Sequence, residues 1–102
     1  MDLQKSLHPL PCTLTPQAID EIKSIMGNKN IPSNYGLRIG TKGGGCAGVS
    51  YIIGFDGKKE SDKEYNVEGI TIFIDRTQAM FLFGLEISFE NTSEGRGFVF
   101  NS

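Results

Sequence analysis

The sequence has no tryptophan, one histidine and only two cysteines among its 102 residues. Two cysteines are too few for the disulfide framework of a small secreted domain, and a reducing compartment would keep Cys12 and Cys46 as thiols. Apolar runs are short, whereas a helix needs about 20 consecutive apolar residues to cross a bilayer. The first residues include Asp2 and Lys5 and have no apolar stretch, so we expect no secretory signal and a cytoplasmic location.

The sequence also lacks a large excess of positive or negative charge. The 10 lysines and arginines are balanced by 12 aspartates and glutamates, and charges of both signs are scattered along the chain. Proteins that bind nucleic acid or an anionic membrane surface concentrate positive charge, so we expect neither partner here. Glycine is abundant, with 13 residues, which indicates the many turns of a β-rich domain. The length suits a single domain.

One segment has helical periodicity. Thr15 is a suitable N-cap and Pro16 a suitable first helical residue, because proline lacks an N–H and that position has no partner for one. We expect the helix to end at Gly27. Prolines before this segment disfavour regular structure, so we assign residues 1–13 to an N-terminal tail and 14–102 to the domain. The apolar positions with helical spacing are Ala18, Ile19, Ile22, Ile25 and Met26.

Most of the remaining chain alternates apolar and polar residues, which is typical of strands. A short second helix is predicted over residues 78–83, ending at Gly84, and a hairpin over the last segments. Helices and strands do not alternate regularly, so we predict a mainly β, or α+β, fold with a mixed or mainly antiparallel sheet. The alternating positions are Leu37 and Ile39; Val49, Tyr51, Ile53 and Phe55; Ile70, Ile72 and Ile74; Ile87 and Phe89; Phe98 and Phe100. The residues expected in the core are Ile19, Ile22, Ile53, Ile72 and Phe81.

Two groups of side chains have simple structural interpretations. The carboxylates of residues 56–64 are expected in a solvated loop without paired geometry. They are Asp56, Glu60, Asp62 and Glu64. The phenylalanines of the second half are most simply packing residues, and an association surface is the second interpretation. They are Phe81, Phe83, Phe89, Phe98 and Phe100.

Residues 43–48, Gly-Gly-Gly-Cys-Ala-Gly, form the one unusual segment. Glycines at 43, 45 and 48 formally match a dinucleotide-binding pattern. That pattern requires a following helix whose N-terminus holds the pyrophosphate, and here the following residues have strand periodicity. A phosphate-binding loop would need Gly-Lys-Ser/Thr after the glycines, which is absent. We therefore do not predict a nucleotide site.

Cys46 has a functional and a structural interpretation. A thiolate on a loop lined by Gly44, Gly45 and Gly48 would be approached by backbone N–H groups and could bind metal. Alternatively, the segment is a tight turn with a small buried cysteine, which the spacing alone favours.

Two further kinds of site receive less support. A nucleophilic cysteine would need a base, and the only histidine, His8, lies in the predicted tail. A tetrahedral zinc site needs four ligands, whereas Cys46, Cys12 and His8 are three. We therefore expect a protein that is not an enzyme and has no self-contained zinc site.

Several short stretches follow one another in an order and spacing that extends from about Leu14 to Phe100. They are residues 14–15, 36–39, 45–48 with Tyr51 and Phe55, Asp75 with residues 81–84, and residues 97–100. In this order they resemble the HesB/IscA family of A-type iron–sulfur carriers. The resemblance implies a compact β-rich domain with an N-terminal helix and a short second helix, which forms a homodimer or larger homo-oligomer. It also implies a role in iron–sulfur cluster assembly, with assembly proteins as possible partners.

The resemblance further implies that Cys46 occupies the position of the family's first cluster ligand. The family has two more cysteines, as Cys-Gly-Cys, beyond the last strand, and this sequence ends at Ser102 without them; Ser88 stands where the family tends to have an acidic residue. A common cluster needs four protein ligands. We therefore expect iron or a cluster to be bound through Cys46 without being held stably by this chain alone. Two hypotheses remain: a carrier with a reduced ligand set, or a dimeric interaction module without a cluster.

Overall fold

Two β-sheets and one long helix make up the fold, and the computed structural model describes residues 10–43 and 49–101. The strand order is β1-β6-β7 in one sheet and β3-β2-β5-β4 in the other. The pairs β1–β6 and β2–β5 are parallel and the other pairs are antiparallel. The predicted mainly β, α+β architecture is confirmed. In chain order the elements are β1 (Thr13–Leu14), α2 (Pro16–Asn28), β2 (Tyr35–Gly43), β3 (Val49–Gly57), β4 (Asp62–Val67), β5 (Ile70–Asp75), the 3-10 helix η2 (Ala79–Leu82), β6 (Glu86–Thr92) and β7 (Gly95–Asn101).

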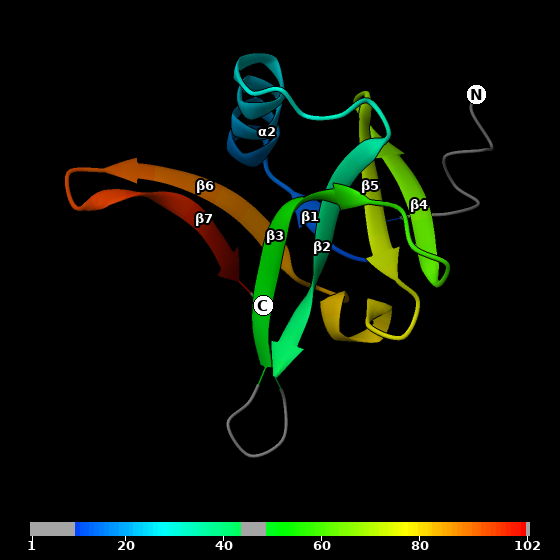
Figure 1. Ribbon diagram of the computed structural model, residues 1–102. Coiled ribbons are helices and arrows are strands. Elements are labelled where there is room, and N and C mark those ends of the chain that lie inside the picture. The colour runs from blue at the N-terminus through cyan, green and yellow to red at the C-terminus, as the bar shows by residue number, and fades with distance from the viewer. Residues whose placement is uncertain (1–9, 44–48, 102) are drawn as a thin grey trace, which may run out of the picture.

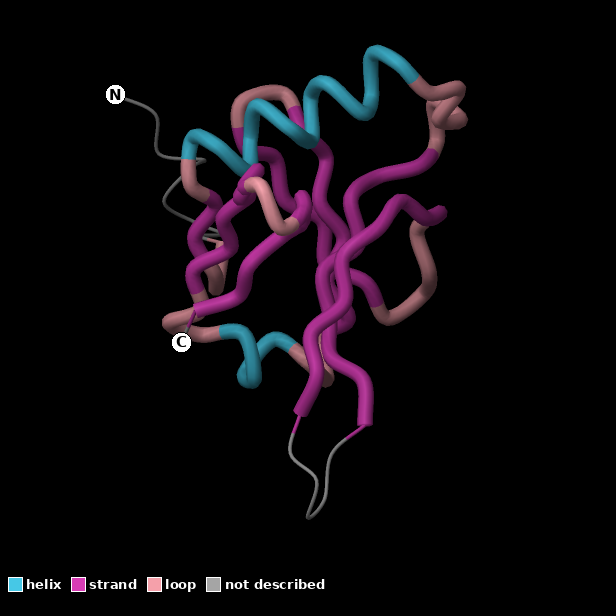
Figure 2. The backbone as a smooth tube through the Cα atoms, turned by 90° about the vertical axis from the view of Figure 1, so that its left-hand side faces the viewer, coloured by secondary structure: helices cyan, strands magenta, loops and turns pink. Residues whose placement is uncertain are grey.

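The helix α2 and the short 3-10 helix η2 lie on opposite sides of the strands (Figure 1). The view turned by 90° shows the same separation, with the strands between them (Figure 2). α2 packs mainly against β6, whereas η2 lies beside β2. Within residues 10–43 and 49–101, no helix is long and apolar enough to cross a membrane.

The start of α2 follows local sequence rules. The Thr15 side chain accepts a hydrogen bond from the Ala18 N–H at 3.2 Å, and Pro16 is the first helical residue, so both predictions are confirmed. The prediction that the helix ends at Gly27 is wrong, because α2 continues to Asn28. The cap residue Lys29 has an extended backbone (φ −118°, ψ 152°), so this helix end needs no glycine in a left-handed conformation.

A single apolar core lies between the helix and the sheets. Of the predicted core residues, Ile19, Ile22 and Ile72 are buried, and Ile53 is partly buried against the core. The prediction for Phe81 is wrong, since this side chain is 51% exposed and the adjacent Leu82 is completely buried. A 3-10 turn repeats every three residues rather than every 3.6, so the residue that faces the core differs from that of an α-helix.

The first described residues pack against the apolar core. Cys12 is buried, and β1 attaches this segment to β6 through two hydrogen bonds, Thr13 N–H to the Leu85 carbonyl (2.8 Å) and Thr15 N–H to the Ile87 carbonyl (3.0 Å). These bonds fix the start of α2 beside β6. The division into a tail of residues 1–13 and a domain of residues 14–102 stays a prediction.

The charged stretch after β3 is not entirely the solvated loop that the sequence predicts. Asp62 is only 4% exposed and begins β4, so its assignment to a solvated loop is wrong. Its carboxylate has a partner, because both oxygens accept hydrogen bonds from the Arg38 guanidinium. An ion pair with this geometry compensates for the loss of water around a buried carboxylate.

Candidate functional site

The candidate site is the connection between β2 and β3, two strands that pair along their whole length. The antiparallel register runs from Tyr35 opposite Gly57 to Gly43 opposite Val49. Gly43 has φ 82°, a conformation that side chains rarely adopt, so glycine is required where the chain leaves β2. The paired ends of β2 and β3 point away from α2 (Figure 1). The predicted site residues, Cys46 with Gly44, Gly45 and Gly48, lie outside the described residues, and their roles stay predictions.

A glutamine holds the strand that leads into this connection. β5 flanks β2 only at Leu37 and Arg38, where these residues pair with Ile72 and Phe73. Nearer to the connection, Gln78 Oε1 accepts a hydrogen bond from the Thr41 N–H at 3.0 Å. A side chain thus takes the place that a neighbouring strand would have. β2 is therefore fixed by β3 on one side and by Gln78 on the other.

Gly40 makes room for this contact. A Cβ atom at Gly40 would lie 2.5 Å from Gln78 Oε1, closer than any normal contact. The sequence pattern did not identify Gln78 as a site residue. The signal in the sequence was its position immediately before the apolar residues of η2. In the structure its side chain makes no capping hydrogen bond to η2 and bonds β2.

The second cysteine, Cys12, belongs to the apolar core. Cys12 is only 4% exposed, and burial raises the pKa of its thiol to about 11. Metal binding requires the thiolate, which a thiol with this pKa scarcely forms near neutral pH. His8, the possible base or ligand of the tail, lies outside the described residues.

The most strongly hydrogen-bonded ionic group of the sheet is centred on Arg38. Its Nη1 donates to Asp62 Oδ1 (2.8 Å), its Nε donates to Asp56 Oδ2 (3.1 Å), and its Nη2 donates to the Gly57 carbonyl (2.9 Å). The Lys59 N–H adds a bond to Asp62 Oδ2 at 2.7 Å. The guanidinium lowers the pKa of the Asp62 carboxyl below its ordinary value, chiefly through these hydrogen bonds. The group joins β2 to the start of β4, and both Asp62 oxygens are engaged in hydrogen bonds.

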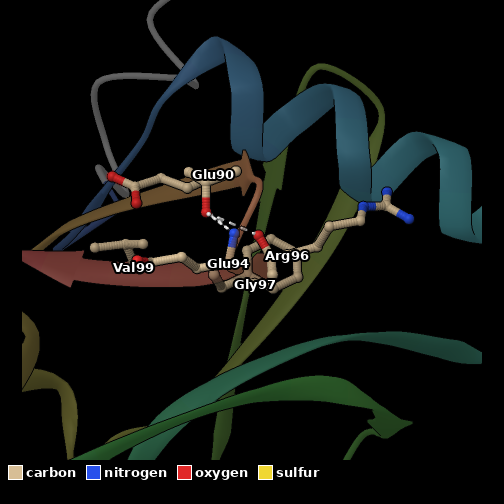
Figure 3. A pocket seen from close by; sticks show the side chains of 8 residues that line it. Glu90, Glu94, Arg96, Gly97 and Val99 are labelled. Atoms are coloured by element: carbon tan, nitrogen blue, oxygen red, sulfur yellow. Dashed lines mark hydrogen bonds between the residues drawn. The ribbon is translucent and has the colours of Figure 1, made fainter.

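A hollow of about 300 Å³ lies on the β6–β7 hairpin (Figure 3). Glu90 and Glu94 line it together with backbone and Val99, while Arg96 extends toward α2, where it bonds Glu21 at 3.2 Å. Two separated carboxylates do not form a metal site. Across residues 10–43 and 49–101, no three His, Cys, Asp or Glu side chains are placed to hold a metal ion. This hollow is therefore not the candidate site.

Comparison with known proteins identifies the family. The pattern of the iron-sulphur cluster biosynthesis family matches residues 11–102. A zebrafish (Danio rerio) protein, the mitochondrial iron-sulfur cluster assembly 1 homolog, is 36% identical over 91 residues, which cover 88% of this chain and 69% of the relative. The Bacillus subtilis protein SufA, itself described as uncharacterized, is 37% identical over 93 residues, covering 90% and 77%. The chain belongs to the iron-sulphur cluster biosynthesis family, and the resemblance to the A-type HesB/IscA carriers is confirmed.

Solved structures agree with this assignment. Escherichia coli SufA, involved in the biosynthesis of iron–sulfur clusters, superposes with a TM-score of 0.72 at 27% identity, covering 88% of this chain and 78% of SufA. IscA with a [2Fe-2S] cluster gives 0.66 at 26% identity, with coverages of 89% and 81%. A protein from Aquifex aeolicus solved by NMR gives 0.67 at 31% identity, with coverages of 91% and 92%. The chain therefore has the HesB/IscA fold.

Proposed function

We propose that this protein is a carrier of iron or an iron–sulfur cluster with a reduced ligand set, in which Cys46 supplies the thiolate. The cluster is then cargo, and the chain is not an enzyme. The observation that carries the proposal is the β2–β3 ladder, which pairs as far as Gly43 and Val49 and so leads directly into the glycine-rich segment with Cys46. Gly44, Gly45 and Gly48 would let backbone N–H groups approach the bound sulfur.

Cys12 is not placed to supply a further ligand. Cys12 is buried, and its thiol has a pKa of about 11. Four protein ligands are the norm for a cluster, so a second copy, a small thiol or an assembly protein would complete the set. The proposal accordingly includes a homo-oligomer in the cytoplasm that works with iron–sulfur assembly proteins.

One observation favours a second function. Met80, Phe81 and Phe83 are strongly exposed, which suits a dimeric interaction module that retains the fold without binding a cluster. The two functions differ in whether iron retention depends on Cys46.

The test is anaerobic loading with iron and sulfide, in the presence and absence of a small thiol, followed by desalting and metal analysis. We expect the chain alone to lose its iron and the chain with thiol to retain it. Cys46→Ser should abolish this retention, and the matched Cys12→Ala variant should not. Equal retention by the protein and by Cys46→Ser would contradict the carrier function and favour the interaction module.

A second variant tests the reduced ligand set. Adding a tail that ends in Cys-Gly-Cys after Ser102 should raise iron retention without added thiol, and Cys46→Ser should remove the gain. Full retention of iron and sulfide by the unmodified chain would show that other ligands are present. A tail without effect would show that Cys46 does not face the site.

A further inference from the structure

The strand β7 is a free edge of the three-stranded sheet. The order β1-β6-β7 gives it a neighbouring strand on one side only among the described residues. Its pairing with β6 is continuous from Glu86 opposite Asn101 to Thr92 opposite Gly95. Proteins usually protect such an edge with lysines, a proline, a bulge or a covering segment, because its unpaired backbone groups can pair with another chain. β7 contains no lysine or proline, and its register has no bulge.

The register also shows which backbone groups of β7 are free. Thr92 and Gly95 flank a two-residue turn, and this flanking pair exchanges both of its backbone hydrogen bonds. Hydrogen-bonded pairs then alternate along the ladder, so the N–H and carbonyl groups of Gly97 and Val99 face β6. The intervening N–H and carbonyl groups face the open edge, and they belong to Arg96, Phe98 and Phe100.

One face of the hairpin has a gap beside this edge. Gly97 lies directly opposite Glu90 of β6, so the two residues share a face. The hollow of about 300 Å³ lies there, and Gly95 and Gly97 are part of its lining. A Cβ atom at Gly97 would have no atom within 4 Å. The opposite face is occupied, because Phe89 and Phe98 make an edge-to-face contact with ring centroids 5.1 Å apart, as the packing interpretation expects.

The hollow carries negative charge. Glu90 and Glu94 line it, and both are exposed. Within residues 10–43 and 49–101, neither carboxylate forms an ion pair. Arg96 is the basic residue of the lining, but its side chain extends in the opposite direction from that of Glu90 and bonds Glu21 at 3.2 Å (Figure 3). A positive group brought to the edge of β7 would therefore meet carboxylates that are not neutralised.

The spacing of a β-sheet suits a long basic side chain at this place. A strand added beside β7 would lie about 4.8 Å from β7 and about 10 Å from β6. A lysine or arginine on that strand could extend its stem across Gly97 toward Glu90, because glycine places no side chain in between. Two residues further along, Val99 lines the same hollow and suits an aliphatic neighbour.

We propose that an extended segment of a partner protein pairs with the free edge of β7, with a lysine or arginine opposite Gly97 and an aliphatic residue opposite Val99. Backbone donors and acceptors that alternate along an edge are matched by another extended backbone, which defines the kind of ligand. The carboxylates select the charge of that ligand. This inference rests on the partner contact included in the proposed function, and it names the surface and the chemistry of that contact.

The test is an NMR titration of the iron-free protein with the acetylated and amidated peptide Ser-Val-Thr-Lys-Thr-Val-Ser. The peptide reads the same in both directions, so it can pair with β7 in a parallel or an antiparallel orientation. We expect saturable binding with a Kd of about 1 mM or lower. The largest shifts should occur at the amides of Arg96, Phe98 and Phe100. Replacing the lysine by glutamine should weaken binding roughly two- to fivefold, and replacing it by glutamate should weaken binding further.

Three variants test the selection of charge. Glu90→Gln should remove the preference for the lysine peptide over the glutamine peptide. Gly97→Thr should also remove it, because the new side chain blocks the path from the edge to Glu90 and leaves the edge N–H groups in place. Glu86→Gln is the matched control and should keep the preference, since Glu86 is exposed on the same strand and face but lies opposite Asn101 rather than a glycine.

A second pair of variants tests the backbone pairing. Arg96→Pro and Arg96→Ala both remove the bond to Glu21, whereas only proline removes an N–H from the open edge. Proline should therefore weaken binding of the lysine peptide about two- to tenfold relative to alanine. Thermal unfolding checks that both variants are folded. The comparison of the three peptides uses the unmodified protein and does not depend on any variant.

Four results would overturn the inference. They are unchanged β7 amides in the presence of the lysine peptide, equal affinity for the lysine and glutamine peptides, a preference that survives Glu90→Gln, and equal binding by the proline and alanine variants. Shifts of the same amides on diluting the protein without peptide would assign the edge to a second copy and would also overturn it. Because the protein is free of iron, failure here leaves iron retention through Cys46 to its own test.

Discussion

Gln78 Oε1 accepts the backbone N–H of Thr41 at 3.0 Å, so a side chain continues the hydrogen bonding of β2 beyond the point where β5 leaves it. The contact depends on Gly40, where a Cβ atom would lie 2.5 Å from the same oxygen. It couples β2, the strand that leads into the Cys46 connection, to the 3-10 helix η2.

We expect Gln78→Ala to lower the free energy of unfolding by about 0.5–1.5 kcal/mol, because the Thr41 N–H loses its protein partner. Gly40→Ala should have a similar cost, since the new methyl group displaces the Gln78 amide. Both changes remove the same bond, so the double variant should cost little more than either single one. Urea unfolding in a double-mutant cycle measures the coupling, and strictly additive effects would contradict the contact.

The buried ion pair between Arg38 and Asp62 should govern acid stability. Because Arg38 lowers the pKa of Asp62, the unfolded chain binds a proton at a higher pH than the folded chain does. The stabilisation is complete above the ordinary value of about 3.9 and is lost as the pH falls through the lower folded value.

Asp62→Ala should cost roughly 3–5 kcal/mol at neutral pH, because it leaves a largely buried guanidinium without its main partner. The difference from the unmodified protein should shrink at pH 3 and below. Thermal or urea unfolding across this range measures it. Glu60→Gln, a substitution at an exposed carboxylate, is the control and should have little effect; a pH-independent cost for Asp62→Ala would show that the ion pair is not the cause.

The two thiols should react at very different rates. Cys12 is buried and its pKa is raised to about 11, so alkylation near neutral pH should require unfolding. We expect Cys46 to react quickly in the native protein, and urea to accelerate only Cys12. Peptide mass mapping after timed alkylation reads both rates in one sample. Rapid native labelling of Cys12 would contradict its burial, and slow labelling of Cys46 would favour a buried turn.

Adjacent residues of η2 should differ sharply in their contribution to stability. Leu82→Ala removes a completely buried side chain and should cost roughly 2–5 kcal/mol. Phe81→Ala changes a side chain that is 51% exposed and should cost about 1 kcal/mol or less. Unfolding at low protein concentration separates these costs from any effect on association. A larger cost for Phe81 than for Leu82 would mean that the turn is rotated relative to the structure.

Local sequence rules predict several elements of this fold correctly. Thr15 and Pro16 define the start of α2 because capping depends only on neighbours within the same turn. The alternating isoleucines of residues 70–74 predict a strand, since side chains of a strand point to opposite faces in turn. The family was also recognisable, because the order of short motifs around Cys46 is itself a property of the sequence.

Other features depend on residues that are far apart in the chain. Asp62 is buried only because Arg38, 24 positions earlier, is brought opposite it by the pairing of β2 with β5 and of β5 with β4. The choice of Leu82 rather than Phe81 for the core required the position of η2 against the sheets, since both residues are apolar and adjacent. Gln78 became part of the candidate site because β5 leaves β2 early and the Gln78 side chain bonds the Thr41 N–H beyond that point. Sequence alone indicated most of the elements and the family, and tertiary structure decided which polar groups are paired and which apolar side chains remain exposed, because both depend on contacts that no local pattern encodes.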